Sequence, residues 1–372
     1  MGILNYFIWN ASPEIFSFTW FSLRWYGLLF ALGFLITQQI LYYMYRKEGK
    51  PESDVDTLTI YMVIATILGA RLGHVIFYEP HIIWEKPLSI FLPFEFSPNF
   101  QFTGLQGLAS HGAAIGILLA LYIYSRKRKP GQTYLYVLDR IVILIALTGA
   151  MIRLGNYFNS EIIGKPSDAP WAVVMVNPLT KDIERNDINK DIESISYVQN
   201  DSSDASTSSR EPGQRPMYAY ITYKTGTSLA KATSIAYNAV NSVSDNRDHF
   251  EPIAQQRTVE TAEGVVSKIS LVGIARHPAQ LYEAISCVAL FLLLMGMWFK
   301  HKEKLVPGRI FGIFLLWLWP MRYLIEFFKE PQVTFEEDMT SFFGLNMGQA
   351  LSIPLIIAGI IILVRSYRKK EA

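Results

Sequence analysis

The sequence predicts an all-α polytopic membrane protein with seven transmembrane helices and one long extracytoplasmic insertion. Three observations support this fold class. Of the 372 residues, 51% are hydrophobic and only 18% are charged, whereas an ordinary soluble domain carries about 25% charged residues. The apolar residues gather into seven stretches, each long enough to cross the roughly 30 Å hydrocarbon core of a bilayer. Lysine and arginine alternate between rich and poor connections along the chain.

Each apolar stretch has about 20 residues, as a membrane-spanning helix requires. The second and fourth are the weakest, because they carry Arg71 and Arg153 within apolar runs. The first residues lack the basic region and the cleavage site of a signal peptide, so the first helix is expected to direct insertion. The predicted helices cover residues 21–43, 58–77, 105–124, 136–158, 278–299, 310–328 and 346–364.

The positions of Lys and Arg predict the orientation, because cytoplasmic loops hold these residues in excess. The connections after the first, third and fifth helices and the end of the chain are basic, whereas those after the second and sixth helices are nearly bare. This alternation places the N-terminus outside and the C-terminus in the cytoplasm. The basic positions are Arg46, Lys47, Lys50, Arg126, Lys127, Arg128, Lys129, Lys300, Lys302, Lys304, Arg309, Arg365, Arg368, Lys369 and Lys370.

The connection between Gly164 and Arg276 is an extracytoplasmic insertion in this topology. Its run DSSDASTSSREPG has the composition of a flexible linker. On either side, WAVVMV and MYAYITYKTGTSLA are rich in β-branched and aromatic residues and are candidates to pair as strands. Three regions are therefore predicted: helices one to four in 1–164, the insertion in 165–275, and helices five to seven in 276–372.

Composition also argues against several classes of protein. The single cysteine, Cys287, cannot form an intramolecular disulfide or a cysteine-based metal site. The net charge of +2 gives no sign of the basic patch that a nucleic-acid-binding protein needs. Neither a metal nor a cofactor is expected.

Ionisable side chains inside the predicted helices are candidates for function, because each is costly in hydrocarbon. In the predicted topology most of them fall in the outer half of the bilayer. Several arginines at one depth would repel one another unless an anion neutralises them, and guanidinium groups suit phosphate oxygens. An outer-leaflet site for a phosphate-bearing substrate is therefore predicted. The residues concerned are Arg24, Tyr26, Arg71, His111, Arg153, Asn156, Arg322 and Glu326.

Two pairs of charged residues within the predicted helices have a simpler explanation. Arg322 and Glu326 are spaced i,i+4 on one helix face, so that a salt bridge between them could occupy the arginine. Asp139 and Arg140 lie at the inner end of the fourth helix, where snorkelling towards water is a sufficient explanation.

The segment GAMIRLGNYFNSEIIG places Arg153 and Asn156 at i,i+3 on one helix face and then reaches Glu161 and Gly164 at the membrane surface. Gly155 within it permits the close approach of another backbone.

In RHPAQLYEA, the proline suits the first turn of a helix. Arg276 and His277 are then expected at its outer mouth, with Gln280 and Glu283 continuing the Arg276 face.

Six segments occur together in one order: RWYGLLFALG at Arg24, GARLGHVIFYEP at Gly69, GLASHGAAIG at Gly107, RLGNYFNSEIIG at Arg153, RHPAQLYEA at Arg276 and MRYLIEFFKEPQ at Met321. In these segments the chain resembles the bacterial prolipoprotein diacylglyceryl transferases, seven-helix inner-membrane enzymes with an outside N-terminus. It departs from them in two places. Ala113 stands where the family usually has a second glycine after His111, and the insertion is longer than in the better-known members.

The resemblance implies transfer of the sn-1,2-diacylglyceryl group from phosphatidylglycerol to the lipobox cysteine of a prolipoprotein, near the outer leaflet of the inner membrane. A thioether forms and glycerol 1-phosphate is released, as the first step of lipoprotein maturation. The implied partners are phosphatidylglycerol, the prolipoprotein signal peptide and the bilayer, without nucleic acid, metal or cofactor. The acceptor supplies the thiol, so Cys287 is expected to have a packing role.

By matching position, His111, Arg153 and Arg322 are the candidate catalytic residues, with His111 as candidate general base. The candidate ligands of phosphatidylglycerol are Arg153, Asn156, Tyr26, Glu161, Gly164 and Glu326. The supporting residues are Arg71, Arg276, His277, Gln280, Tyr282 and Glu283.

Two other functions are considered. A transporter for an anionic solute would continue its polar residues to the inner side and often contain an internal repeat, but the inner halves of the helices are almost purely apolar. A receptor or scaffold that binds a partner through the insertion gives no reason for arginines within several helices.

Overall fold

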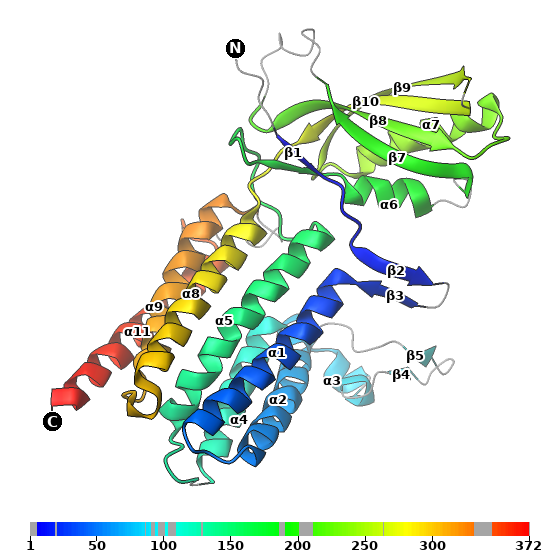
Figure 1. Ribbon diagram of the computed structural model, residues 1–372. Helices are drawn as coiled ribbons and strands as arrows, with labels where there is room; N and C mark the ends of the chain where they lie inside the picture. The colour runs from blue at the N-terminus through cyan, green and yellow to red at the C-terminus, as the bar shows by residue number, and fades with distance from the viewer. Residues whose placement is uncertain are drawn as a thin grey trace. The chain divides into compact units, whose positions relative to one another are not determined.

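The computed structural model describes residues 6–18, 21–85, 87–90, 94–95, 101–102, 109–127, 129–185, 190–200, 211–262, 264–330 and 344–371. The described chain is mostly helical, and six of its helices are long and apolar enough to cross a membrane (Figure 1). The protein is therefore a polytopic membrane protein. The six helices are α1 (Trp25–Lys47), α2 (Ser53–Tyr78), α5 (Tyr134–Asn159), α8 (Ala279–His301), α9 (Arg309–Ile325) and α11 (Met347–Glu371).

A further apolar helix, α4 (Ser110–Ser125), is shorter than these six. It corresponds to the third predicted span, of which residues 105–108 lie outside the described residues. Short elements precede it: α3 (Ile82–Glu85), a 3-10 turn (Pro87–Ile90), and the paired strands β4 (Phe94–Glu95) and β5 (Gln101–Phe102).

The first predicted helix begins too early in the sequence. Phe21–Arg24 is strand β3, which pairs antiparallel with β2 (Glu14–Phe18), and α1 begins at Trp25. The backbone N–H of Trp25 donates to the carbonyl of Pro13 at 3.0 Å. A short apolar run does not by itself distinguish strand from helix, and here the pairing with β2 decides.

The chain divides into two compact units. The first unit comprises Met1–Leu32, Gly149–Cys287 and Pro320–Ile353. The second comprises Gly33–Thr148, Val288–Trp319 and Pro354–Ala372.

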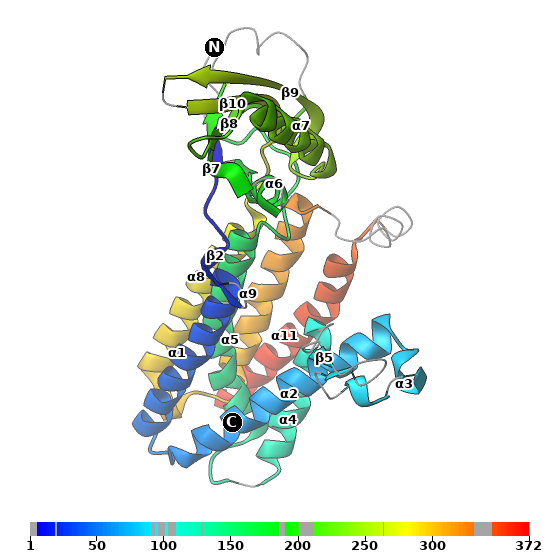
Figure 2. The same ribbon diagram turned by 90° about the vertical axis from the view of Figure 1, so that its right-hand side faces the viewer.

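The first unit contains a four-stranded antiparallel sheet in the order β7-β8-β10-β9 (Figure 1). Its strands are β7 (Ile192–Gln199), β8 (Gln214–Tyr223), β9 (Phe250–Thr261) and β10 (Gly264–Ile274). One sheet face forms a core with α6 (Asn177–Arg185) and α7 (Leu229–Asp245), and Figure 2 shows α7 beside β9 and β10. Ser228 begins α7 by accepting the Lys231 N–H at 3.3 Å, as N-cap serines do.

The two strand-like runs of the insertion lie in different sheets. WAVVMV contains β6 (Val173–Met175), which pairs parallel with β1 (Phe7–Trp9) near the N-terminus, whereas MYAYITY belongs to β8. The expectation that they pair with one another was therefore wrong, because strand propensity does not specify the partner. The end of the second run, TSLA, caps and begins α7 instead. Residues 201–210 of the expected linker lie outside the described residues.

In the second unit, α2 and α4 cross where both helices carry glycines. A Cβ atom on Gly112 would meet the Gly69 carbonyl oxygen and lie 2.7 Å from the Gly73 Cα. A Cβ on Gly116 would lie 2.6 Å from the Ala65 carbonyl oxygen. Small residues let membrane helices approach closely, so this contact sets the position of α4 and of His111 near its start.

Gly112→Ala is expected to destabilise the protein by about 1–3 kcal/mol, the usual cost of overpacking. Gly296→Ala in α8 is the matched control, because a Cβ there meets nothing within 4 Å and alanine favours helix over glycine by about 1 kcal/mol. Thermal unfolding in detergent measures both variants. A Gly112→Ala protein as stable as Gly296→Ala would show that the crossing tolerates a wider spacing.

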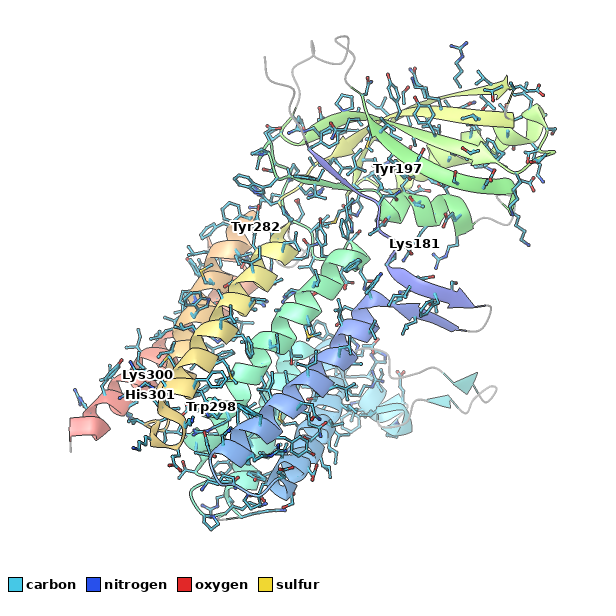
Figure 3. All side chains as sticks on the ribbon, viewed as in Figure 1. Lys181, Tyr197, Tyr282, Trp298, Lys300 and His301 are labelled. Atoms are coloured by element: carbon cyan, nitrogen blue, oxygen red, sulfur yellow. The ribbon has the colours of Figure 1, made fainter. Side chains whose placement is uncertain are left out.

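Asp139 and Arg140 do not snorkel, which corrects the sequence interpretation. Arg140 and Glu48 form an ion pair with 2.9 Å between Nη2 and Oε1, and their side chains are 1% and 0% exposed. Trp298, which lies near the end of α8 in Figure 3, donates to Glu48 Oε1 at 2.5 Å. Asp139 accepts the N–H groups of Gly308 and Phe311 at 2.7 Å each, and so caps the start of α9. Both residues therefore have structural partners inside the protein.

Candidate functional site

The polar cluster of the first unit is built on α5, α8 and the end of α9. Arg153 of α5 and Lys329, which follows the 3-10 turn Glu326–Phe328, both contact Glu283 of α8. The Arg153 Nε pairs with Glu283 Oε2, and the Lys329 Nζ lies 2.5 Å from Oε1. The side chains of Glu283 and Lys329 are 8% and 5% exposed. One buried carboxylate therefore holds two cations from two other helical segments.

This arrangement changes the electrostatic inference drawn from the sequence. Converging arginines would need a bound anion only if no carboxylate lay among them. Glu283 pairs with both Arg153 and Lys329, and Glu326 adds a second carboxylate beside Lys329. These two cations and two carboxylates balance one another without a ligand. The cluster still presents guanidinium and ammonium groups that can bind phosphate oxygens.

Arg153 is the first member of a chain of side-chain hydrogen bonds at the end of α5. Its Nη1 donates to Asn156 Oδ1 at 3.5 Å, so the predicted i,i+3 relationship is confirmed. The Nδ2 atom of Asn156 donates to Glu161 Oε1 at 2.6 Å, and Asn159 donates to the same oxygen at 3.3 Å. Glu161 thereby orients the two amides, and Asn156 links it to Arg153.

The loop after α5 has an unusual backbone. Ser160 and Ile162 have φ angles of 55° and 58°, and each such non-glycine residue costs about 1–3 kcal/mol. Gly164 is tightly enclosed, because a Cβ there would meet the His277 carbonyl oxygen and lie 2.9 Å from that of Phe328. Gln280 donates to the Glu161 carbonyl at 2.6 Å. The surrounding contacts impose the strained geometry, a feature typical of functional loops.

Arg276 ties this loop to two other segments. Its Nη1 donates to the Gly164 carbonyl at 3.0 Å and to Glu330 Oε2 at 2.7 Å. Its Nε donates to the Asp248 carbonyl at 2.6 Å. The side chain is buried. Arg276 is thus a positioning residue that joins the loop after α5, the segment after α9 and the insertion.

His277 and Tyr282 form a second group at the start of α8, where Figure 3 labels Tyr282. The His277 Nδ1 lies 3.0 Å from the Tyr282 hydroxyl, which also accepts the Trp171 indole N–H at 2.7 Å. Burial lowers the pKa of His277 and so favours its neutral imidazole. His277 and Tyr282 are therefore linked to each other and to Trp171 near the start of α8.

Tyr26 and Glu326 approach the cluster beside glycines. A Cβ on Gly155 would lie 2.9 Å from the Tyr26 Cα, so this glycine permits close contact between α1 and α5. A Cβ on Gly348 would lie 2.8 Å from the Glu326 Cδ.

Glu326 forms its ion pair with Lys329 and not with Arg322. The Glu326 Oε2 lies 3.4 Å from Lys329 Nζ, and no ion pair joins Arg322 to any carboxylate within the described ranges. Arg322 does interact electrostatically with Glu283. The alternative of an i,i+4 salt bridge is therefore wrong, and the half-buried guanidinium of Arg322 stays available.

Arg71 and His111 belong to the second unit. Arg71 is buried in α2. His111 is half-buried at the start of α4, where its ring lies 5.1 Å from that of Phe77 and 6.0 Å from that of Tyr78.

Sequence reasoning missed Lys329 as a member of the site. The residue stands in the quoted segment MRYLIEFFKEPQ, at the end of an apolar run where a lysine usually snorkels to water. Its burial at 6% and its two carboxylate contacts became evident only in the structure. The signal in the sequence was its distance of three residues from Glu326.

Fold and site together define a polytopic membrane protein that carries a buried, charge-balanced polar cluster on apolar helices. The family described as "Prolipoprotein diacylglyceryl transferase" matches residues 13–365. The chain therefore belongs to the prolipoprotein diacylglyceryl transferase family.

Relatives match over nearly the whole chain and carry the name phosphatidylglycerol–prolipoprotein diacylglyceryl transferase. The protein of Bacteroides fragilis is 31% identical over 365 residues, which cover 98% of this chain and 96% of the relative. That of Tolumonas auensis is 31% identical and covers 97% and 98%. That of Chloroherpeton thalassium is 30% identical and covers 100% and 98%.

Proposed function

We propose that this protein transfers the sn-1,2-diacylglyceryl group of phosphatidylglycerol to the lipobox cysteine thiol of prolipoproteins. Family membership over residues 13–365 supports the reaction. The observation that carries the site is the pairing of half-buried Arg153 and buried Lys329 with the buried carboxylate of Glu283. A transporter for an anionic solute has no comparable support.

The reaction is a substitution at carbon. The cysteine thiolate attacks the diacylglyceryl carbon that bears the phosphate oxygen, a C–S bond forms, and the C–O bond breaks. The electron pair of that bond stays on the phosphate oxygen, and glycerol 1-phosphate leaves. Because negative charge develops on the leaving phosphate, positioned cations lower the barrier.

The proposed roles follow from the contacts of each residue. Arg153 and Arg322 bind the phosphate and stabilise the leaving group. Asn156 and Glu161 fix the orientation of the Arg153 guanidinium through their hydrogen bonds. Glu283 and Lys329 keep the cluster charge-balanced, and His111 takes the thiol proton. The remaining proposed ligands are Tyr26, Gly164 and Glu326, with Arg71, Arg276, His277, Gln280 and Tyr282 in support.

The proposed setting is the bacterial inner membrane, with seven spanning helices, the N-terminus outside and the C-terminus cytoplasmic. The site then lies near the outer leaflet, where phosphatidylglycerol enters laterally from the bilayer. Helices one to four fall in residues 1–164, the extracytoplasmic insertion in 165–275, and helices five to seven in 276–372.

Purified protein in nanodiscs tests the function directly. With phosphatidylglycerol and a lipobox peptide, mass spectrometry should detect a diacylglyceryl thioether on the cysteine. A Cys→Ser peptide is the matched control and should stay unmodified. Absence of product in the presence of folded protein would contradict the assignment.

His111→Gln is expected to lower kcat by about a hundredfold or more at pH 7, the scale of general-base catalysis. Because a free thiol has a pKa near 8.5, the variant should recover activity about tenfold per pH unit as the thiolate forms unaided. The pH–rate profile measures this recovery. A loss of only a few-fold with an unchanged profile would assign His111 to binding or structure.

Lys329→Gln is expected to raise the KM for phosphatidylglycerol about tenfold or more. Removing this cation leaves net negative charge beside the phosphate, and unit charges ~8 Å apart at an effective dielectric constant near 20 interact by about 2 kcal/mol. Lys329→Arg keeps the charge and should restore most of the affinity. Kinetics in mixed micelles measure both, and equal KM values for wild type and Lys329→Gln would remove Lys329 from the site.

A further inference from the structure

The four-stranded sheet of the insertion has one covered face and one more open face. On β8, Met217, Ala219 and Ile221 are fully buried in the core formed with α6 and α7. Side chains alternate along a strand, so Tyr218 and Tyr220 point to the opposite face, where they are only partly buried. The second face is therefore open to a partner.

Two cations lie side by side on this open face. Lys268 of β10 is the register partner of both Tyr220 on β8 and Arg257 on β9. These three residues form the Tyr220–Lys268–Arg257 row, which crosses three strands. Like charges placed directly opposite in a sheet repel each other, so the row carries an unfavourable interaction that an anion would relieve.

Among the described residues, no carboxylate neutralises the cations of the row. Within the described part of the chain, neither Lys268 nor Arg257 has a carboxylate within ion-pair distance. The Lys268 Nζ instead lies 3.5 Å from the centre of the Tyr218 ring and 5.9 Å from that of Tyr220. Cation–π contacts of this kind hold the ammonium in place without neutralising it.

A shallow cavity of about 580 Å³ lies over the row. Its lining combines the two cations and the Tyr220 ring with the apolar side chains of Val259 and Val266, and among the described residues it includes no carboxylate. Cationic groups beside aromatic and aliphatic surface suit a ligand that is both anionic and partly apolar.

The path of the chain indicates which partner can reach this surface. The insertion leaves the helices after Gly164 and returns at Arg276, and these residues are hydrogen-bonded at 3.0 Å. Both belong to the same compact unit as the Arg153–Glu283–Lys329 cluster and the sheet. In Figure 1 the sheet lies beyond the ends of α5 and α8 that carry this cluster. In the proposed topology the insertion is extracytoplasmic, so the part of the substrate that follows its cysteine emerges on the same side of the membrane as the insertion.

We infer that the open face of this sheet, centred on the Tyr220–Lys268–Arg257 row, binds an acidic, extended stretch of the prolipoprotein that follows its lipobox cysteine. The inference rests on the proposed function and adds a determinant of substrate preference to it. Carboxylates of the substrate pair with Lys268 and Arg257, while the tyrosine rings and valines cover its apolar atoms. An extended chain advances about 3.3 Å per residue, so a few residues suffice to span the row.

Three lipobox peptides test the inference with the full-length protein in phosphatidylglycerol nanodiscs. They share one signal sequence and differ only after the cysteine, where the segment is acidic, neutral or basic. Wild-type protein should prefer the acidic over the neutral peptide by about two- to fivefold in kcat/KM, the range of exposed ion pairs. The difference should lie in KM and should disappear near 1 M salt, where the screening length is about 3 Å.

The variants Lys268→Gln, Arg257→Gln and their combination should lose this preference while activity on the neutral peptide stays unchanged. Arg247→Gln is the matched control, because Arg247 is an exposed cation of the same insertion whose Nε donates to the Ser244 carbonyl. It should keep the preference. The combined variant Lys268→Glu with Arg257→Glu should favour the basic peptide.

The outcomes separate the possible occupants. An unchanged preference in the combined Gln variant overturns the inference. Equal loss on all three peptides, together with weaker binding of the detergent-solubilised protein to phosphatidylglycerol vesicles, assigns the face to lipid instead. Should the Glu variant fail to fold, the Gln variants decide the question. Failure of the proposed function looks different, because no peptide would then receive a thioether from any variant.

Discussion

Replacement of Arg153 by alanine is expected to lower kcat/KM for thioether formation by about a hundred- to a thousandfold. This is the scale on which one preorganised donor to a developing negative charge acts. The substitution removes the guanidinium that pairs with Glu283 and that donates to Asn156 at 3.5 Å. A coupled assay for glycerol 1-phosphate and mass spectrometry of the peptide measure the loss. Activity above half of the wild-type value would exclude Arg153 from the reaction.

Loss of folding must be separated from loss of chemistry. Arg153→Ala leaves Glu283 with Lys329 as its remaining ion-pair partner, so the destabilisation should stay below the roughly 3–5 kcal/mol of a fully broken buried pair. The double variant Arg153→Gln with Glu283→Gln removes both charges of the pair and leaves Lys329 with Glu326, 3.4 Å away, so its stability should be close to that of Arg153→Ala. It should not recover activity, because the phosphate-binding group is still absent.

Arg153→Lys completes this series. It keeps the charge but loses the planar fork that binds two phosphate oxygens at once. We expect activity between those of Arg153→Ala and wild type, with most of the loss in kcat. Full activity in Arg153→Lys would show that charge alone suffices.

Glu48→Ala is expected to lower the free energy of unfolding by about 3–5 kcal/mol, because it leaves a buried guanidinium without a counter-charge. Arg140 is 1% exposed and has Glu48 as its ion-pair partner, while Trp298 and Tyr136 also donate to this carboxylate. The variant thus removes the acceptor of three donors in the interior of the second unit.

Reversible unfolding of the detergent-solubilised protein by SDS, followed by circular dichroism, measures this effect. The double variant Glu48→Gln with Arg140→Gln is the control, since it removes both charges together. It should be more stable than Glu48→Ala if the unpaired charge is the main cost. A Glu48→Ala protein within about 1 kcal/mol of wild type, the size of a single ordinary hydrogen bond, would mean that water reaches Arg140.

The sequence predicted one local relationship within the polar cluster but not the balance of its charges. Arg153 and Asn156 were placed on one face because helical spacing alone decides that relationship, and the 3.5 Å contact confirms it. The partner of Arg153 could not be predicted in the same way. Glu283 lies on a helix separated by more than a hundred residues, and the charge balance of the cluster depends on that distant contact.

The prediction that Asp139 and Arg140 snorkel towards water was wrong for a related reason. Their position near a helix end made snorkelling plausible, but burial depends on what packs against the helix end. Here Glu48, Trp298 and the start of α9 close around them. Likewise, the insertion showed strand propensity, yet the partners of β6 and β8 are set by long-range pairing.

The sequence by itself determined that this is a polytopic membrane protein, where most of its apolar helices lie, and to which family it belongs. These features are local, because a bilayer requires runs of about 20 apolar residues whatever their neighbours are. Only the tertiary structure decided that Lys329 joins the cluster, that Glu283 pairs with two cations, and that two cations share an open sheet face. These features depend on distances between residues far apart in the chain, and electrostatic energy is a function of such distances.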